Sequence, residues 1–221
     1  MNLAIFDLDN TLIGGDSDYE WIRFIIAKGM VDAEHYEKEN NRFYQEYKNR
    51  TLDIFEYQRF VLEPLMALSQ NTLAQLQKEF METNIAPIRL VKAETLLQKH
   101  RSQGDTLLVI TATNRFVTAP IVDALKIDNL LATDPEVIDG HFTGNIVGDP
   151  CYQEGKVRRL ERWLKKQGQQ AKSITFYSDS INDAPLLHYA DYAIVVDPDD
   201  HLRALAEEQQ WPIISLRSDI K

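Results

Sequence analysis

The sequence predicts an α/β protein, with a Rossmann-like parallel sheet as its core and an inserted all-helical cap. Short apolar runs alternate with helical segments along most of the 221 residues, which is typical of parallel β-α-β units. A helical, aromatic-rich block at about residues 16–82 interrupts this alternation, and we expect no strand within it. The expected organisation is therefore an α/β core formed by residues 1–15 and 83–221, and a helical cap formed by residues 16–82.

The first half of the chain contains one predicted strand and the cap. Residues 3–6 form a short apolar run of the kind that is buried in a parallel sheet, and a polar cluster follows at residues 7–11. Helical segments of the cap include residues 54–62 and 72–83. After Pro87 we expect a helix that runs to about residue 100, because Gly104 supplies a stop signal.

The second half of the chain alternates between strands and helices. A buried strand at residues 107–110 is expected to end at Thr111, and a helix follows at about residues 116–125. After a short strand at 130–133, Asp139 and Gly140 lie between apolar residues, which predicts a β-hairpin. A long amphipathic helix spans about residues 154–167. Strands at 174–177 and 192–196 flank a helical stretch at 184–189, and a last strand is expected at 213–215.

The composition is that of a globular protein and argues against several classes of partner. Hydrophobic residues make up 44% and charged residues 26% of the chain. The net charge of −10 argues against a nucleic-acid partner. No apolar run is long enough to span a bilayer, the N-terminus does not resemble a secretory signal, and the single Cys151 forms no internal disulfide. We expect a cytoplasmic protein without a membrane partner, either a monomer or a dimer.

Acids, a hydroxyl and a lysine lie at the predicted carboxyl ends of the strands, where ligands bind in open α/β sheets. The first strand leads into Asp7 and Asp9, the second into Thr111, and the strand at 174–177 into Asp179, while Lys156 lies near the start of a helix. Clustered carboxylates repel one another unless a cation intervenes, and an all-oxygen site suits Mg²⁺. One carboxylate can attack phosphorus to form an aspartyl-phosphate, and another can transfer protons. The pattern predicts a magnesium-dependent phosphomonoester phosphatase that acts on a small phosphorylated metabolite.

Four ordered segments resemble the motifs of the haloacid dehalogenase (HAD) superfamily. The segments are Asp7-Leu8-Asp9-Asn10-Thr11, the strand that ends in Thr111, Lys156, and Ser178-Asp179-Ser180-Ile181-Asn182-Asp183. The helical block between the first two resembles the C1 cap of the phosphoserine-phosphatase-like branch, subfamily IB. The resemblance implies that Asp7 is the nucleophile, that Asp9 is the general acid and base, and that Thr111 and Lys156 bind phosphate.

The same resemblance implies a metal site and substrate contacts. Asp7, the backbone carbonyl of Asp9 and Asp179 would hold Mg²⁺, with Asn182 and Asp183 in support of the metal and the lysine. The candidate substrate-binding residues are Asp16, Arg59, Thr111, Ala112 and Asn114. Asp16 matches the position of a substrate-contacting glutamate in phosphoserine phosphatases, yet it also suits the dipole at the start of a helix. Arg59 has the alternative of a plain surface role.

A closer resemblance indicates which substrate to expect. Residues 14–18 and 110–118 resemble a bacterial group that includes histidinol-phosphate phosphatases, which makes histidinol phosphate the first candidate. Thr111, Ala112 and Thr113 stand where phosphoserine phosphatases usually have a Ser-Gly-Gly type turn. Phosphoserine or another small phosphorylated amine or alcohol therefore comes second, and a phosphotransferase activity stays open.

A different class of function also phosphorylates an aspartate in an acidic magnesium pocket, namely the signalling receiver domain. Such a domain has no helical insertion and carries its phosphoacceptor later than the first strand. The position of Asp7 and the block at residues 16–82 both count against it. A catalytically inactive member that acts by binding is disfavoured because every expected catalytic carboxylate is present. The aromatic residues of the cap are expected to form its core rather than a stacking platform.

Overall fold

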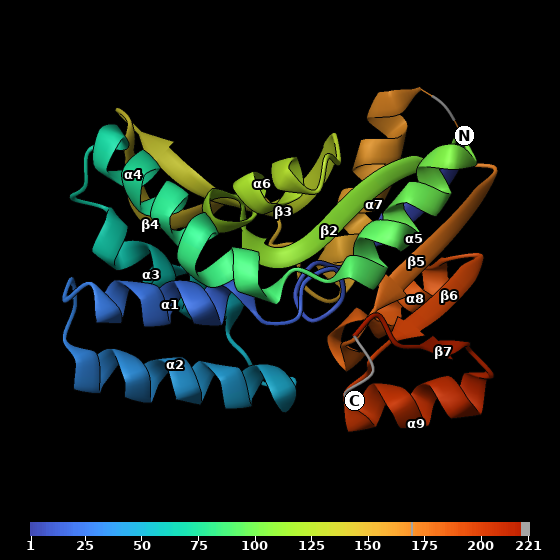
Figure 1. Ribbon diagram of the computed structural model, residues 1–221, viewed down its shortest axis with the longest axis horizontal. Helices are drawn as coiled ribbons and strands as arrows, with labels where there is room; N and C mark the ends of the chain where they lie inside the picture. Colours follow the sequence, from blue (N-terminus) through green and yellow to red (C-terminus); the bar gives the residue numbers. More distant parts are fainter. Residues whose placement is uncertain (169, 218–221) are drawn as a thin grey trace.

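The computed structural model describes residues 1–168 and 170–217 and has the predicted α/β architecture (Figure 1). Its seven-stranded sheet has the order β4-β3-β2-β1-β5-β6-β7, and every neighbouring pair is parallel except β3 and β4. The strands are β1 (Asn2–Phe6), β2 (Thr106–Asn114), β3 (Asn129–Ile138), β4 (His141–Val147), β5 (Ser173–Ser178), β6 (Tyr192–Val196) and β7 (Ile213–Ile214).

Helices fill the connections between the strands. They are α1 (Ser17–Ala27), α2 (Ala33–Lys48), α3 (Ile54–Leu62), α4 (Gln70–Phe80), α5 (Val91–Ser102), α6 (Arg115–Ala124), α7 (Glu154–Gln167), α8 (Ala184–Tyr189) and α9 (Asp200–Gln209). Short 3-10 turns lie at Glu63–Leu65, Ala86–Ile88 and Ile181–Asp183, and a π-helical turn lies at Met81–Ile85. The expected helices at 54–62, 154–167 and 184–189 coincide with α3, α7 and α8.

The sheet is buried on both faces, as the apolar character of its strands predicts. In β1, Leu3 and Ile5 belong to one hydrophobic cluster, whereas Ala4 and Phe6 belong to a second. Because successive side chains of a strand point to opposite faces, the two clusters cover the two faces of the sheet. The cluster that contains Phe6 continues into the cap through buried aromatic residues such as Trp21. The expected aromatic core of the cap is therefore confirmed for part of the cap aromatics.

Helices α1 to α4 gather at one end of the molecule, on the left in Figure 1. The predicted domain limits at residues 15/16 and 82/83 stay a prediction, since α1 begins at Ser17 and the turn Met81–Ile85 crosses the second limit. Residues 218–221, the end of the expected core, lie outside the described residues. Within the part of the chain that is described, no helix has the length and apolar character needed to cross a membrane.

Two strands are longer than the sequence predicts, and both differences have a physical reason. Strand β2 continues past Thr111 to Asn114, because Thr111 and Thr113 are β-branched and favour extended backbone, like the apolar residues before them. Strand β3 extends to Ile138 because the hairpin prolongs it: β4 pairs with it in antiparallel fashion. Asp139 and Gly140 both have positive φ at the turn, as the dipeptide predicts.

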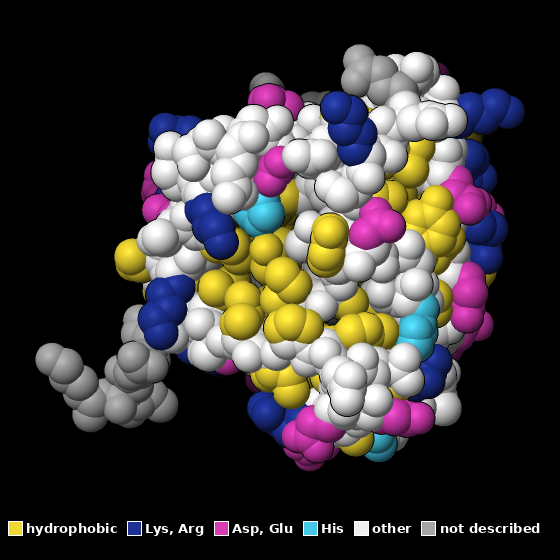
Figure 2. Space-filling view, turned by 90° about the vertical axis from the view of Figure 1, so that its right-hand side faces the viewer, with side chains coloured by type: hydrophobic (Ala, Val, Ile, Leu, Met, Phe, Trp, Pro, Cys, Tyr) yellow, Lys and Arg dark blue, Asp and Glu magenta, His cyan; other side chains and the backbone are white. Residues whose placement is uncertain are grey.

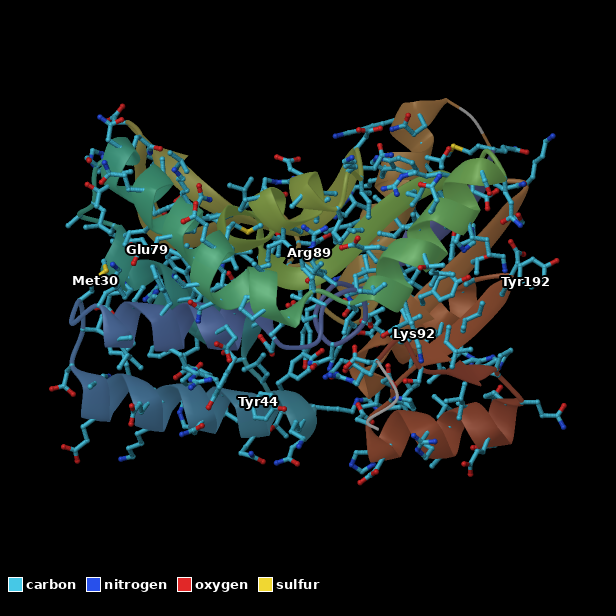
Figure 3. The ribbon with its side chains drawn as sticks, viewed as in Figure 1. Met30, Tyr44, Glu79, Arg89, Lys92 and Tyr192 are labelled. Atoms are coloured by element: carbon cyan, nitrogen blue, oxygen red, sulfur yellow. The ribbon has the colours of Figure 1, made fainter. Side chains whose placement is uncertain are left out.

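The face on the right-hand side of Figure 1 has an apolar area near its centre, surrounded by scattered charged side chains (Figure 2). Tyr192, which is labelled on that side in Figure 3, is 62% exposed. The acidic groups discussed below belong to a different part of the molecule, where the cap meets the sheet.

Candidate active site

A cavity lies where the carboxyl ends of β1, β2 and β5 meet the cap helices α1, α2 and α3. Its lining combines residues of both parts: Asp7, Asp9, Asn10, Asp16, Asp18, Tyr19, Asn40, Phe43, Tyr44, Tyr47, Leu52, Ile54, Tyr57, Thr111, Ala112, Thr113 and Asp179. Strand topology explains the core side, since neighbouring parallel strands end at the same edge of the sheet. The cap side closes the cavity with aromatic rings, of which Tyr44 is labelled on α2 in Figure 3.

Lys156 is buried between two carboxylates beneath the cavity. Its Nζ lies 2.7 Å from Oδ1 of Asp7 and 2.7 Å from Oδ2 of Asp183, and the lysine side chain is 2% exposed. Burial alone would lower the pKa of Lys156, but Asp183 and Asp7 outweigh it and raise that pKa. Burial raises the pKa of Asp7 to about 8, against the opposing effect of Lys156. The lysine therefore stays charged and fixes one oxygen of Asp7, which leaves Oδ2 as the oxygen available for chemistry.

Helix α7 presents this lysine because its first turn lies against the preceding loop. A Cβ atom on Gly155 would lie 2.1 Å from the carbonyl oxygen of Pro150, so only glycine permits this approach. Gln153, just before the helix, has φ 48° and ψ −125°, a conformation that non-glycine residues rarely adopt. Its side chain donates hydrogen bonds to Tyr152 and Asn182, at 3.1 and 3.2 Å, which hold the residue there.

Asp9 also lines the cavity and is held by donors from two elements. Its Oδ1 accepts a hydrogen bond of 2.7 Å from the backbone N–H of Ser17, and its Oδ2 accepts one of 2.8 Å from the hydroxyl of Thr113. The hydroxyl of Thr111 lies 3.5 Å from the same oxygen. Burial raises the pKa of Asp9 even though these hydrogen bonds favour its charged form. A carboxyl group with a raised pKa can hold a proton and deliver it.

Asp7 and Asp179 offer oxygen ligands that fit one hard cation. Oδ1 of Asp179 accepts a hydrogen bond of 3.1 Å from Thr11, and burial followed by the charges of Asp7 and Asp183 raises its pKa. Among the described residues, no three Asp, Glu, His or Cys side chains form a group able to hold a metal alone. A cation here would need backbone, water or substrate oxygens besides these two carboxylates. Mg²⁺ binds in this way, since it keeps several waters and takes one or two carboxylates plus phosphate oxygens.

A family model for haloacid dehalogenase-like hydrolases matches residues 4–188, which is most of the chain and includes every element that lines the cavity. The chain belongs to this HAD-like hydrolase family. Over 220 residues it is 42% identical to a histidinol-phosphatase from Neisseria meningitidis serogroup C (strain 8013), an alignment that covers 98% of this chain and 99% of that protein. The family membership sets aside the receiver-domain alternative.

Two further comparisons with this HAD-like hydrolase concern a phosphatase of known class and a solved structure of the same fold. A phosphoserine phosphatase from Mycobacterium tuberculosis (strain ATCC 25618 / H37Rv) is 31% identical over 217 residues, 97% of this chain and 70% of that protein. The crystal structure of a protein with unknown function from Bordetella pertussis Tohama I superposes with a TM-score of 0.91 at 39% identity, covering 97% of this chain and 98% of that one. The predicted class, a HAD-type phosphoric monoester hydrolase, is confirmed.

Two residues predicted to bind substrate lie outside the lining of the cavity. Arg59 is exposed, and its guanidinium lies 3.4 Å from Oδ1 of Asn145 in a separate surface groove next to β4. On α3, Ile54 and Tyr57 face the cavity one turn apart, and a residue two positions after Tyr57 points the other way. Arg59 is thus a neighbour of the β3–β4 hairpin, which suits the surface role considered above, and its contact with substrate stays a prediction.

Asn114 has structural partners on every polar atom of its side chain. Its Oδ1 caps α6 by accepting from the N–H of Val117 at 3.1 Å, and its Nδ2 donates to Asp18 at 3.2 Å. The side chain is 0% exposed, behind the cavity wall. Thr111, Ala112 and Thr113 line the cavity, whereas Asn114 follows them at the end of β2 and lies outside the lining. Asn114 therefore has partners in Val117 and Asp18, and its contact with substrate stays a prediction.

The HAD-like hydrolase also has site residues that the sequence reading did not assign. Thr113 was overlooked because the strand was expected to stop at Thr111, although the alternation of the two threonines was a usable signal. Tyr47 reaches the core loop after β5, with its hydroxyl 3.1 Å from Oγ of Ser180. No sequence signal separates Tyr47 from the aromatic residues of the cap core. Asp18 also lines the cavity beside Asp16, at a position where the sequence left open both a helix-dipole interaction and a contact with a substrate amine.

Proposed function

We propose that this protein is a magnesium-dependent phosphatase of a small phosphorylated metabolite and that Asp7 is transiently phosphorylated. The observation that carries the proposal is the ion pair on Asp7: Lys156 holds one of its oxygens at 2.7 Å, and the Asp7 side chain lines the same cavity as Asp9. A fixed carboxylate oxygen beside a buried cation is suited to attack a phosphorus atom.

In the first half of the proposed reaction, Oδ2 of Asp7 forms a bond to phosphorus as the ester P–O bond breaks. Asp9 donates its proton to the departing alkoxide, which leaves as the alcohol. Lys156 and the hydroxyl of Thr111 offset charge on the phosphoryl oxygens. In the second half, Asp9 removes a proton from water, the water oxygen attacks phosphorus, and the bond to Asp7 breaks with release of inorganic phosphate. Mg²⁺, held by Asp7, the Asp9 backbone carbonyl and Asp179, would neutralise further phosphoryl charge.

Two other features support a phosphoryl-transfer site. The cap encloses the cavity with the aromatic rings of Tyr44, Tyr47 and Tyr57, and exclusion of bulk water strengthens electrostatic interactions and protects the phosphorylated aspartate. Asp183 and Asn182 support the site from the loop after β5: Asp183 pairs with Lys156, and Asn182 forms hydrogen bonds with Tyr152 and with Tyr47 of cap helix α2.

Histidinol phosphate is the first candidate substrate. Support comes from the 42% identity to a histidinol-phosphatase over nearly the whole of both chains. Phosphoserine is the second candidate because of the 31% identity to a phosphoserine phosphatase. Transfer of the phosphoryl group to an acceptor other than water stays open, as do the predicted cytoplasmic location and the oligomeric state.

The proposal is tested by labelling and by turnover in the same preparations. With radiolabelled substrate and rapid acid quench, wild-type protein is expected to carry label that Asp7→Asn lacks, and Asp7→Asn is expected to lose at least about 1,000-fold in kcat. Asp149→Asn, which alters a surface carboxylate, is the matched control. Near-normal turnover by Asp7→Asn would refute the nucleophile assignment.

The metal is tested with a readout besides activity. A chelator is expected to abolish turnover and Mg²⁺ to restore it. In addition, Mg²⁺ is expected to raise the thermal midpoint of the wild type, because a ligand that binds the folded state stabilises it. Asp179→Asn should weaken this stabilisation. Full activity in metal-free buffer, or an identical shift in Asp179→Asn, would contradict the proposed metal site.

A further inference from the structure

The turn that follows β6 has no part in the chemistry proposed above. It consists of residues 197–199 and lies between β6, which ends at Val196, and α9, which begins at Asp200. Because β6 runs parallel to β5 as its neighbour, the turn lies at the same edge of the sheet as the loop that carries Asp179. Residues 197–199 lie outside the lining of the cavity, so the turn can act on the site only through the residues that it contacts.

Asp199 of this turn holds the loop of Asp179 at two points. Its backbone N–H donates a hydrogen bond of 2.9 Å to the carbonyl of Asp179. Its Oδ2 accepts a hydrogen bond of 2.9 Å from the N–H of Ile181. Ile181 is the first residue of the 3-10 turn Ile181–Asp183, and the first N–H groups of a helix have no partner within it. The carboxylate of Asp199 therefore supplies an acceptor for a donor that the 3-10 turn leaves unpaired.

The other oxygen of the same carboxylate is fixed by α9. Oδ1 of Asp199 accepts a hydrogen bond of 2.7 Å from the N–H of Leu202 and so caps the helix. Leu202 and Ala206 of α9 are buried in one of the two hydrophobic clusters that cover the sheet. Asp199 thus connects a helix that is packed against the sheet to the loop of Asp179, with one carboxylate oxygen for each.

Asp197 anchors the turn on its other side. Its N–H donates to the carbonyl of Ile214 in β7 at 3.0 Å, and its Oδ2 accepts from the N–H of Leu216 at 3.0 Å. The residue has φ 41°, a conformation that residues other than glycine rarely adopt, and these two hydrogen bonds hold it there. Because the turn is attached to β7 as well as to α9, Asp199 has a fixed position relative to the sheet.

Asp179 is held from a second direction by the loop after β1. The hydroxyl of Thr11 donates a hydrogen bond of 3.1 Å to Oδ1 of Asp179. Thr11 thus orients the side chain, while Asp199 fixes the backbone of the loop. Groups that hold the ligands of a metal ion typically change its affinity by about 10- to 100-fold when they are removed, because they keep the ligand oxygens where the cation needs them.

We propose that Asp199 is a positioning residue of this site: it fixes the loop of Asp179 and thereby sets the affinity of the site for a divalent cation. The inference rests on the proposed metal site and adds to it a residue that touches neither the cation nor the substrate. Asp199→Asn keeps the backbone hydrogen bond to Asp179 and removes one side-chain acceptor. We therefore expect weaker cation binding in this variant and no complete loss.

A simpler explanation is that Asp199 only caps α9. Asp32 has a capping role at the start of α2, where it accepts a hydrogen bond of 2.7 Å from the N–H of His35. Capping alone predicts that a substitution lowers the thermal stability of the protein equally with and without Mg²⁺. It gives no reason for the hydrogen bond between Oδ2 of Asp199 and Ile181, a residue outside α9.

The first test measures thermal unfolding over a range of Mg²⁺ concentrations for the wild type, Asp199→Asn and Asp32→Asn. Asparagine is a good N-cap residue, but its side chain has one acceptor oxygen in place of two. Asp199→Asn is expected to need about 10-fold more Mg²⁺ than the wild type for the same rise in thermal midpoint, whereas Asp32→Asn should follow the wild type. An identical Mg²⁺ dependence in Asp199→Asn would overturn the inference. The absence of any rise in the wild type would overturn the proposed metal site with it.

The second test separates cation affinity from chemistry. In Asp199→Asn, the Mg²⁺ concentration for half-maximal hydrolysis of p-nitrophenyl phosphate should rise by about 10-fold, while kcat at saturating Mg²⁺ stays within about threefold. Asp199→Ser, which can cap the helix through a single oxygen, should behave likewise. A loss of kcat that excess Mg²⁺ does not restore, or an unchanged Mg²⁺ requirement in both variants, would overturn the inference. Absence of hydrolysis by the wild type would overturn the proposed function, and the thermal titration would still decide the role of Asp199.

A measurement on the wild-type protein tests the contact itself and needs no variant that folds. The amide hydrogen of Ile181 is expected to exchange with solvent at least about 100-fold more slowly than in an unstructured peptide, because Asp199 accepts its hydrogen bond. Exchange at the rate of an unstructured peptide would show that the contact does not hold the loop and would overturn the inference.

Discussion

The side-chain amide of Asn182 donates a hydrogen bond of 2.9 Å to the backbone carbonyl of Tyr47, which joins the loop after β5 to cap helix α2. The same asparagine accepts hydrogen bonds from Tyr152 at 3.1 Å and Gln153 at 3.2 Å. A single buried side chain thus connects the cap, the loop after β5 and the segment before Lys156. We infer that Asn182 fixes the position of cap helix α2 relative to Lys156.

Asn182→Ala is therefore expected to loosen the cap and the lysine segment together. The free energy of unfolding should fall by about 2–3 kcal/mol, because several buried partners lose their hydrogen bonds. The value of kcat/KM should fall by about 10-fold. Tyr47→Phe is the matched control: it keeps the backbone carbonyl and loses only the 3.1 Å hydrogen bond to Ser180. Equal effects of the two variants in denaturant unfolding and kinetics would argue against a connecting role for Asn182.

Lys156→Met is expected to be both unstable and inactive. The substitution leaves the carboxylates of Asp7 and Asp183, each now 2.7 Å from the ammonium, buried without their cation. Loss of one partner of a buried ion pair costs about 3–5 kcal/mol. Adding Asp183→Asn should recover part of the stability without recovering turnover, and a double-mutant cycle would measure this coupling. Turnover within about tenfold of the wild type in Lys156→Met would contradict the assigned role.

Gly155→Ala tests how α7 places the lysine. The new Cβ would lie 2.1 Å from the carbonyl oxygen of Pro150, so the helix start must move. We expect a loss of about 3 kcal/mol in unfolding free energy and a large loss of kcat. Gly168→Ala is the control, because its site has φ +63° and no atom within 4 Å of the new Cβ, and only about 1 kcal/mol of backbone strain is expected. If both variants behave alike, the contact with Pro150 does not position Lys156.

The pH dependence of stability should change in Asp16→Asn. Burial, and then the charge of Asp9, raises the pKa of Asp16 from 3.8 to about 7. The folded protein therefore binds more protons than the unfolded chain between about pH 4 and 7, so this group lowers stability progressively as the pH rises through that range. Asn keeps the capping function without the charge.

At pH 8 and without divalent cations, Asp16→Asn is expected to exceed the wild type by about 2 kcal/mol in unfolding free energy. Near pH 4 the two proteins should be alike. Thermal unfolding at both pH values measures the difference, with the exposed Asp123→Asn as a control for the loss of one negative charge. A constant difference between Asp16→Asn and the wild type across this range would contradict the raised pKa.

Much of the fold could be read from the chain because the periodic patterns are local. The amphipathic helix at α7 and the apolar strand at β6 were predicted with the bounds that the structure has. Strand ends were harder to predict, since the threonines that extend β2 continue no apolar run and the extension pairs with β3 only at Asn114. The catalytic groups at the strand ends could be predicted for a topological reason: parallel strands bring their carboxyl ends together.

The sequence by itself determined the α/β class, the helical insertion and the set of carboxylates and lysine that meet at the sheet edge. Only the tertiary structure decided which cap residues face those groups. The side chains of a helix point in all directions around its axis. The way the helix packs against its neighbours decides which of them face the cavity. For this reason Arg59 turned out to lie at the hairpin, while Asp18 and Asn40 came to line the cavity.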